Sequence, residues 1–445
     1  MYATGPGSLI GYARYPRRKY RYRQATLTTC LSTIDTRVSM SHALPPHRFL
    51  IPNLLGQMAF GLIAMTLSIP SMQEWGAIFG EDQPTVQMTL SAYLLLYGTA
   101  QLIYGPLSDR YGRKRLLMLG LILAGVGSAL AALAPSLPLL IAARALQGAG
   151  CAAGMVLGRA MVQDFFDGPE RTRVMAYTGM AMGLCPPLGT IIGGQIHVSV
   201  GWQGNFVLSA LLALVMLLAA WRGLPVHRKQ PIRVDSHWLS EMLAAYRQLL
   251  RAPIFLGYIG VIGMSTAVFY VFLGGAPIVL GSYGVGPDGI GWYIAAIPLA
   301  YIFGNYATSH LIHRLGEPLT MTIGQGLALA SIWLLLWLSF IGIHTPLAFT
   351  LPLMLLGIGH GFIMPPSLAG TVSVLPALAG AAAAVAGLLQ QLMGAIGGLV
   401  VGLVPHEGTT NLGWMLLGFT LLAIIMQLLL RHAQVAGAVH PGETG

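Results

Sequence analysis

Twelve apolar runs, each about as long as a membrane is thick, dominate this sequence. A helix needs about 20 mostly apolar residues to cross the hydrocarbon core of a bilayer. Nearly every gap between the runs holds a proline, a glycine pair or a charge cluster, which tend to end helices. The pattern predicts an all-α polytopic membrane protein with twelve transmembrane helices in two six-helix pseudo-repeat bundles. The predicted spans lie near residues 50–70, 88–107, 115–134, 137–158, 174–196, 204–222, 253–280, 289–310, 319–340, 346–366, 377–403 and 412–430.

The composition is typical of a membrane protein. Of its 445 residues, 55% are hydrophobic and only 9% are Asp, Glu, Lys or Arg, whereas soluble domains carry about 25% charged residues. The three cysteines offer no disulfide framework, because Cys151 and Cys185 fall inside predicted spans.

The basic residues predict the orientation in the membrane, because short cytoplasmic loops retain Lys and Arg. With the N-terminus inside, the cytoplasmic segments contain all 24 basic residues except Arg144. The outer loops carry acids instead, namely Glu74, Glu81, Asp82, Asp288 and Glu407. We therefore expect a multi-pass protein of the bacterial inner (plasma) membrane with both termini cytoplasmic. The net charge of +10 then reflects topology and does not indicate nucleic-acid binding.

The spacing of the runs predicts five parts. These are a basic, disordered N-terminal tail (1–48), an N-terminal six-helix bundle (49–222), a cytoplasmic linker (223–251), a C-terminal six-helix bundle (252–431) and a C-terminal tail (432–445). The first tail includes "RYPRRKYRYRQ" and lacks the apolar core of a secretory signal. Met40, just before the first span, is an alternative start of the protein.

A weak internal repeat supports two equivalent halves. "SHLIHRLGE" at 309–317 follows the eighth span and echoes "GPLSDRYGR" at 105–113, which follows the second, so that Gly316 corresponds to Gly112. Internal repeats of this kind are typical of transporters whose halves rock around a site near the midplane.

The stretch "GPLSDRYGRKR" at 105–115 is the most polar segment of the well-patterned part. Gly105 and Gly112 permit tight backbone turns. Asp109 lies where an acid can accept backbone N–H groups near a helix start. The basic residues at 113–115 can meet anionic lipid headgroups.

This stretch resembles the loop motif G-x-L-x-D-R-x-G-R-[KR]-[KR] of the major facilitator superfamily. In that family the loop acts as a latch between the two halves and stabilises one access state. The alternative is a plain positive-inside anchor. The resemblance implies a latch made of Gly105, Asp109, Arg110, Gly112, Arg113 and Lys114.

The fourth span contains an arginine, in "LIAARALQGAGCAAG" at 140–154. An arginine inside a span costs about 2.5–3.5 kcal/mol on insertion scales, so it usually faces a cavity or a partner. Arg144 and Gln147 resemble the superfamily's fourth-span motif, in which the arginine takes part in proton coupling. The alternative is a structural arginine bonded to backbone carbonyls of a neighbouring helix.

The fifth span carries "GMAMGLCPPLGTIIGG" at 179–194, whose prolines should kink the helix. Its glycines permit close helix packing. The stretch looks like the antiporter motif of drug exporters, although a Pro-Pro replaces the usual Gly-Pro; a plain packing face is the alternative. The residues concerned are Gly183, Pro186, Pro187, Gly189, Gly193 and Gly194.

Three further segments resemble the Bcr/CflA group of drug:proton antiporters. They are "VFYVFLGGAPIVL" in the seventh span, "GHGFIMPPSLAG" in the tenth and "LAGAAAAVAGLLQQLMGAIGG" in the eleventh. With the motifs of spans 2 to 5, the similarity runs from about residue 50 to 430.

The chain departs from this group at the acid of the first span. Where the group has "D-M-Y-L-P-A-L-P", this chain reads "TLSIPSMQE", with Thr66 at the acidic position, and none of its 14 acids lies in the middle of a span. Candidate proton-coupling groups are then Glu74, Asp109 and His360, the last because an imidazole titrates near neutral pH. Indirect coupling, or none, is the alternative.

Polar and aromatic side chains on otherwise apolar spans predict the lining of a substrate cavity. With one fixed cation and no buried acid, such a cavity favours neutral, zwitterionic or anionic amphiphiles over multivalent cations. The predicted lining is Gln57, Thr66, Tyr93, Tyr97, Tyr270, Asn305 and Gln390, with Arg144 and Gln147.

These features predict a secondary transporter that exports amphipathic small molecules by proton antiport, with a small-molecule substrate, protons and the lipid bilayer as partners. No cofactor or metal is expected. None of the three lysines follows a glycine, which excludes a Walker-type ATP loop, and no enzyme motif is found. Each chain contains both halves and is expected to work as a monomer. The alternatives are a dedicated exporter of one metabolite such as a siderophore, a proton-coupled uptake symporter, and a non-transporting receptor.

Overall fold

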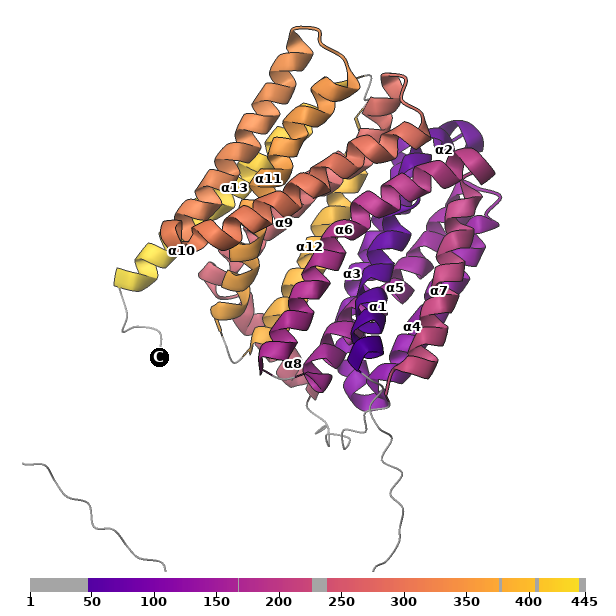
Figure 1. The fold of residues 1–445 in the computed structure, drawn as a ribbon. Helices are drawn as coiled ribbons and strands as arrows, with labels where there is room; N and C mark the ends of the chain where they lie inside the picture. The colour runs from indigo at the N-terminus through magenta and orange to yellow at the C-terminus, as the bar shows by residue number, and fades with distance from the viewer. Residues whose placement is uncertain (1–46, 167, 226–237, 376–377, 405–407, 440–445) are drawn as a thin grey trace, which may run out of the picture. The chain divides into compact units, whose positions relative to one another are not determined.

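All regular elements in the described part of the chain are helices (Figure 1). The computed structural model describes residues 47–166, 168–225, 238–375, 378–404 and 408–439. Residues 1–46 of the predicted N-terminal tail, with Met40, lie outside these residues, and residues 47–48 already belong to the first helix. The elements are α1 (His47–Thr66), η1 (Ile69–Ser71), α2 (Met72–Phe79), α3 (Gln83–Tyr111), α4 (Arg113–Ala132), α5 (Leu137–Phe165), α6 (Gly168–Val200), α7 (Gln203–Gly223), α8 (Trp238–Leu249), α9 (Pro253–Ser282), α10 (Pro287–Phe340), α11 (Pro346–Ser373), α12 (Ala379–Gly402) and α13 (Thr409–Val439).

The helix α10 is two membrane spans joined at a glycine. Its 54 residues would extend about 80 Å as one straight helix, far more than the roughly 30 Å of a bilayer core. Gly316 breaks it, with φ of 73° and ψ of 165°. Among the described residues, nine helices or continuous segments are long and apolar enough to span a membrane, with α10 counted once. Its second part, α3 and α6 complete the twelve predicted spans.

The outer faces of these helices carry large apolar side chains. Ile103, Leu211 and Leu351 are each more than half exposed. Soluble monomers rarely expose apolar surface on this scale, whereas lipid solvates it. The described fold therefore confirms the polytopic membrane protein predicted from the hydropathy pattern.

The two ends of the helix bundle differ in charge. We call the end that carries Arg110, Arg113, Lys114, Arg222 and Arg431 the basic end, and the end that carries Glu74, Glu81, Asp82 and Asp288 the acidic end. At the acidic end Asp82 caps α3, where its Oδ1 accepts the Thr85 N–H at 3.0 Å. Hydrogen bonds from Thr85 hold the pKa of the Asp82 carboxyl below its ordinary value.

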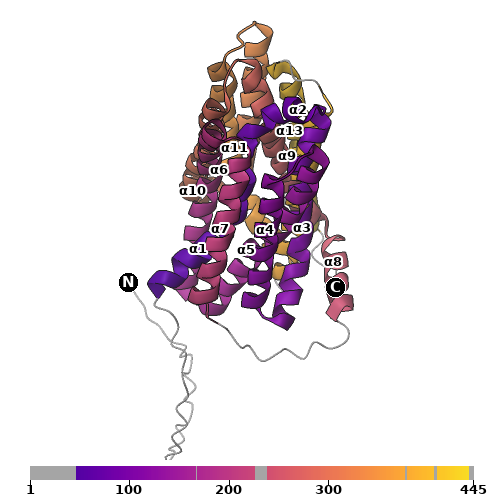
Figure 2. The ribbon, with the colours of Figure 1, turned by 90° about the vertical axis from the view of Figure 1, so that its right-hand side faces the viewer.

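Helices of each half pack mainly with one another. In the first half α5 packs against α1, α3 and α4, and α4 packs against α7; Figure 2 shows these helices side by side. In the second half α11 packs against α10, while α9 packs against α12 and α13. Two helix pairs make most of the contact between the halves, α3 with α12 and α6 with α10. We call these pairs the α3–α12 seam and the α6–α10 seam.

The internal repeat found in the sequence recurs in the backbone. Gly112, between α3 and α4, has φ of 93°, and Gly316, between the two parts of α10, has φ of 73°. Both conformations lie where side chains with a Cβ are strained. Equivalent glycines thus make equivalent turns after the second span of each half.

We predict that Gly316→Ala destabilises the protein by about 1–2 kcal/mol, because alanine must adopt a left-handed backbone conformation. Gly326→Ala is the matched control. It lies in the same helix with an ordinary φ and no atom within 4 Å of the position that an added methyl group would take, so it should be neutral or stabilising by up to about 1 kcal/mol. Thermal unfolding of the purified variants measures both. Equal losses would contradict the role of Gly316 as a turn.

Candidate functional site between the halves

The α6–α10 seam is a contact of backbone against backbone near the acidic end. A methyl group on Gly194 would overlap the carbonyl oxygen of Pro287, and one on Gly291 would overlap that of Thr190. The Thr190 hydroxyl donates to Gly291 O at 3.3 Å, and Gln195 Nε2 donates to Asp288 O at 3.4 Å. The Gly-Gly predicted as part of an antiporter motif therefore includes a residue of the contact between the halves.

The other glycines of this motif divide between two partners. Gly183 approaches the side chain of Ile302 on α10, at the seam. Gly189 and Gly193 face the end of α1 instead, where added methyl groups would overlap the Thr66 hydroxyl and Leu67 O. These two glycines fix α6 within the first half.

The two prolines do not end α6, which continues through Pro186 and Pro187 to Val200. The Thr190 hydroxyl lies 3.0 Å from Pro186 O and 3.1 Å from Pro187 O. Its hydroxyl group thus provides a donor near carbonyls in the part of the helix that the prolines disturb.

The α3–α12 seam reaches further along the bundle. Ser91 Oγ donates to Ala395 O at 2.9 Å. Nearer the middle, a Cβ on Gly98 would come within 2.8 Å of Gln391 Cβ, and one on Gly387 within 3.1 Å of Gln101 Oε1. The halves are in contact here from the acidic end to beyond the midpoint of α3.

Toward the basic end the α6–α10 seam opens. Gly183 is followed in that direction by Gly179, around which no atom lies within 4 Å of an added Cβ. Met180 and Phe303, on the two helices of the seam, are 57% and 62% exposed. The close backbone contacts between α6 and α10 therefore lie toward the acidic end.

A hydrogen-bonded cluster fastens the acidic end of the first half. His197 Nδ1 lies 2.8 Å from Ser71 Oγ, and His197 Nε2 lies 2.9 Å from Glu74 Oε2. Asn205 Nδ2 donates to Ser71 Oγ and to Gly193 O, each at 3.1 Å. The predicted coupling residue Glu74 is thus bonded to a histidine that the sequence analysis did not select.

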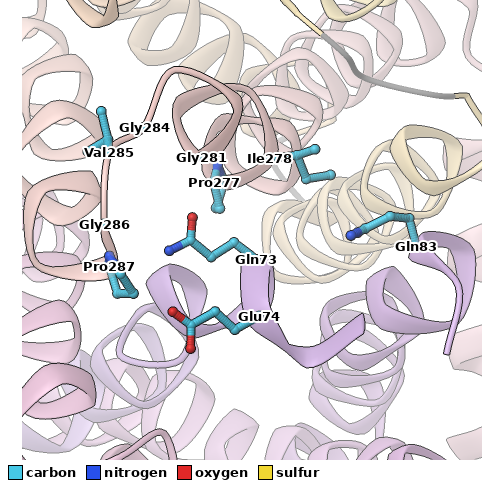
Figure 3. A pocket seen from close by; sticks show the side chains of 10 residues that line it. All are labelled: Gln73, Glu74, Gln83, Pro277, Ile278, Gly281, Gly284, Val285, Gly286 and Pro287. Carbon is cyan, nitrogen blue, oxygen red and sulfur yellow. The ribbon is translucent and has the colours of Figure 1, made fainter. Parts of the chain in front are cut away.

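A pocket of about 390 Å³ lies beside this cluster, between α2 and the turn from α9 to α10. The side chains of Gln73 and Glu74 point from α2 toward that turn (Figure 3). Among the described residues, no group of three or more His, Cys, Asp or Glu could hold a metal ion. The lining is Gln73, Glu74, Gln83, Pro277, Ile278, Gly281, Gly284, Val285, Gly286 and Pro287.

Arg144 lies in the interior of the first half, where it is 1% exposed. Its Nη1 donates to Gln147 Oε1 at 2.5 Å and to Ala64 O at 3.2 Å. The guanidinium lies 4.4 Å from the Tyr93 ring centroid, a cation–π distance. Gln147 in turn donates to Ser128 Oγ at 2.8 Å. These contacts match the structural alternative, an arginine bonded to the carbonyls of a neighbouring helix.

Three predicted cavity residues are also buried inside the first half. Gln57 Nε2 donates to Asn53 Oδ1 at 3.0 Å and to Met216 O at 2.9 Å. The Tyr93 hydroxyl donates to Gly61 O at 2.7 Å, and the Thr66 hydroxyl to Leu62 O at 2.9 Å. Their polar groups bond to the first half itself, so the structure places them in helix contacts.

The other predicted cavity residues lie close to the seams. The Tyr97 hydroxyl is buried and has no hydrogen-bond partner in the described structure, and its ring stacks on Tyr93 at 5.9 Å. From the second half, the Tyr270 hydroxyl reaches Met65 Sδ at 3.6 Å. Asn305 and Gln390, on α10 and α12, are partly exposed.

The predicted latch makes its observed contacts within the first half. Arg113 Nε lies 2.5 Å from Asp164 Oδ2. Lys114 Nζ donates to Trp221 O at 2.7 Å and to Leu224 O at 2.6 Å, at the end of α7. The guanidinium carbon of Arg110 lies 5.5 Å from the centroid of the Tyr111 ring. These contacts tie α4 to α5 and α7.

Gly105 and Asp109 differ from the other members of the predicted latch. Gly105 lies inside α3 with open space around it, so the tight turn expected there is wrong, and only Gly112 makes one. The Asp109 side chain is outside the part of the chain that the structure describes, although its backbone belongs to α3.

His360 is buried in the second half, where it is 6% exposed. It lies three turns along α11 from Phe349 and on the same face, and Phe349 stacks on Phe272 of α9 at 6.4 Å. No hydrogen bond to its ring is found among the described residues. His360 thus faces the packing between α9 and α11.

Sequence reasoning missed two polar residues of this region. His197 lies in the last turn of α6, the fifth span, where the sequence pattern pointed only to glycines and prolines. The predicted fourth span ends at residue 158 and leaves Arg159 in a loop, whereas α5 continues to Phe165. An unbroken helical pattern through 159–165 was the available signal.

We predict that Gly194→Ala lowers stability by about 1–3 kcal/mol, because its methyl group must push α6 away from α10. Gly179→Ala, in the same helix with free space around it, should have little effect. Thermal unfolding measures the difference. Labelling of a cysteine introduced by Gln73→Cys should also become faster in the Gly194 variant, since the acidic end loosens. Equal behaviour of the two variants would exclude a tight seam at Gly194.

We further predict that Arg144→Ala destabilises the protein by about 3 kcal/mol or more, because it orphans buried partners. Arg159→Ala, at an exposed position of the same helix, should change stability by only about 0.5 kcal/mol. Thermal unfolding midpoints in one detergent test the contrast. A stable Arg144 variant would rule out the structural role.

Comparison with known proteins places this arrangement in a family. The sequence pattern of the Major Facilitator Superfamily matches residues 54–398. A chloramphenicol resistance protein of Pseudomonas aeruginosa is 29% identical over 86% of this chain and 90% of its own length. The multidrug resistance protein D of Escherichia coli (strain K12) is 25% identical over 83% of this chain and 92% of its own.

Two further similarities are informative. A bicyclomycin resistance protein homolog of Haemophilus influenzae is 25% identical over 75% of this chain and 83% of its own. In fold, the chain resembles a crystal structure of the peptide transporter POT in complex with alafosfalin, with a TM-score of 0.67 at 16% identity, over 87% of this chain and 95% of that one.

Proposed function

The chain belongs to the Major Facilitator Superfamily, and on that basis we propose that it exports amphipathic small molecules, drugs among them, across the inner membrane in exchange for protons. It is a multi-pass secondary transporter and not an enzyme. The relatives named for resistance to chloramphenicol, to multiple drugs and to bicyclomycin favour export over uptake.

The observation that carries this proposal is the uneven contact between the halves. They meet backbone to backbone at Gly194 and Gly291 near the acidic end, whereas Gly179, further toward the basic end, has free space around it. A transporter that alternates access must close one end while the other is open. On this proposal, a bundle held together at the acidic end accepts its substrate from the basic end.

The charge asymmetry of the two ends supports the direction. If the basic end faces the cytoplasm, as the positive-inside rule favours, the open end receives its substrate from the cytoplasm. Both termini are then cytoplasmic. A single chain contains both halves and both seams, which favours a monomer as the working unit.

Proton exchange can drive such a transporter even without an acid in the middle of the first span. One proton entering through about 100 mV and one pH unit supplies roughly 3.7 kcal/mol, enough for a concentration gradient of several hundredfold. The titratable groups at hand are the Glu74–His197 pair at the acidic end and the buried His360.

Other functions predict different measurements. A dedicated exporter of one metabolite, such as a siderophore, responds to that compound alone. An uptake symporter accumulates its substrate in energised cells. A receptor shows no flux at all. The export relatives favour the broad exporter, and the three alternatives are separated by the following experiment.

We predict that respiring everted vesicles containing the protein lose part of their pH gradient when an exported compound is added, because protons leave in exchange for it. The panel contains chloramphenicol, nalidixate and ethidium. Asp109→Asn, in the predicted latch, should reduce the response. Glu81→Gln is the control, since it removes an acid from an exposed turn at the acidic end and should leave the response intact.

Three results would contradict broad proton-coupled export. No response to any compound contradicts it directly. Accumulation of the compound by intact energised cells indicates symport. Binding of a compound without flux in either direction indicates a receptor.

A further inference from the structure

An arginine between the two seams has no acidic partner within the described residues. Arg159 lies on α5, six residues before its end, and its side chain is exposed. The polar contact found for its guanidinium in the described part of the chain is with Met182 Sδ, 4.0 Å from Nη2. A charge within a span is retained only where it meets water, a partner or a ligand.

The neighbours found for the Arg159 guanidinium, Met182 and Tyr97, lie deeper in the bundle than its own position on α5. Gly148 of α5 packs on the Tyr93 backbone of α3, and the two helices run in the same direction, so Arg159 is level with Tyr104. Yet Arg159 interacts electrostatically with Tyr97, which lies about 10 Å deeper along α3. Side chains on a helix lean toward its N-terminus, here the acidic end.

The neighbours of Arg159 are the residues where the halves meet. Tyr97 precedes Gly98, through which α3 contacts Gln391 of α12. Met182 precedes Gly183, through which α6 contacts Ile302 of α10. Arg159 therefore lies between the two seams and faces the space between the halves.

A second polar group at this place is also left unsatisfied by the described residues. The Tyr97 side chain is 3% exposed, and its hydroxyl has no hydrogen bond in the described structure. A buried hydroxyl without a partner costs about 1–3 kcal/mol. A bound ligand with an acceptor group would satisfy the hydroxyl and the nearby guanidinium together.

We propose that Arg159 and Tyr97 form the subsite that binds the anionic or strongly electron-rich end of the transported compound, which makes organic carboxylates preferred substrates. The proposal rests on the export function above and specifies its substrate class. A guanidinium offers paired N–H donors that match a carboxylate. The flanking Met182 and the Tyr97 ring provide apolar surface for the rest of an amphiphile.

Arg144 cannot take this role, although it is the arginine that the sequence singled out. Its guanidinium already donates to Gln147 Oε1 and to carbonyl oxygens of α1, whereas the polar contact found for Arg159 among the described residues is the Met182 sulfur. The cation that selects substrates is thus 15 residues further along the same helix.

The test is equilibrium binding of three compounds to the purified protein in lipid nanodiscs. Nalidixate is a flat aromatic carboxylate, chloramphenicol is neutral and ethidium is cationic. Arg159→Gln should weaken nalidixate binding about tenfold or more, the usual effect of losing a hydrogen bond between charged groups. Chloramphenicol binding should change less than about threefold, because no full charge is lost.

Two more variants sharpen the result. Arg159→Lys keeps the charge and should keep part of the nalidixate affinity. Tyr97→Phe removes only the hydroxyl and should weaken nalidixate binding more than ethidium binding. Arg222→Gln is the matched control, since it removes an exposed arginine at the basic end of α7, away from both seams, and should leave all three affinities unchanged.

The outcomes separate the subsite from the proposed function. If the unmutated protein binds none of the compounds, broad drug export is contradicted and the subsite with it. If it binds them and Arg159→Gln weakens all three equally, or none, then the subsite alone is contradicted. A selective loss for nalidixate supports it.

Discussion

The structure depends on helices that touch backbone to backbone across the two halves. Within a bilayer no water satisfies open N–H and C=O groups, so every span must be a helix, and apolar packing against lipid gives helices little reason to associate. Gly194 against Pro287 and Gly291 against Thr190 remove the side chains that would otherwise separate α6 from α10. Contacts of this kind bring α6 and α10 closer together than any side chain would allow.

Two arginines on α5 show how burial decides the role of one residue type. Arg144 is enclosed by Gln147, α1 carbonyls and the Tyr93 ring, so its contacts join helices of the first half. Arg159 has an exposed side chain, and the polar contact found for its guanidinium in the described part of the chain is the Met182 sulfur. Their positions differ by about four turns of helix, and the proposed subsite uses only the second.

The sequence predicted what depends on local pattern. The twelve spans follow from hydropathy, and the equivalence of Gly112 with Gly316 follows from a repeat that both positive φ values bear out. The contacts that the sequence analysis missed join residues that lie far apart in the chain. His197 meets Glu74 across 123 positions, and no local spacing encodes that contact. The sequence also could not show which neighbours the Arg144 side chain contacts. The same helical periodicity is expected whether the residue faces a substrate cavity or the packed interior of the first half. Arg159 was not selected because the predicted fourth span ended at residue 158, seven residues before the observed end of α5.

The structure shows what occupies the position where related transporters carry an acid in the first span. At that position Thr66 bonds to Leu62 O and packs against Gly189, so the site is filled by a helix contact and has no room for a hydrated carboxylate. The acid and base of this region lie further toward the acidic end, as Glu74 and His197, where they link α2 to α6 beside the α6–α10 seam. This pair joins segments that flank the contact at Gly194, so it helps to hold α2 and α6 together beside the α6–α10 seam.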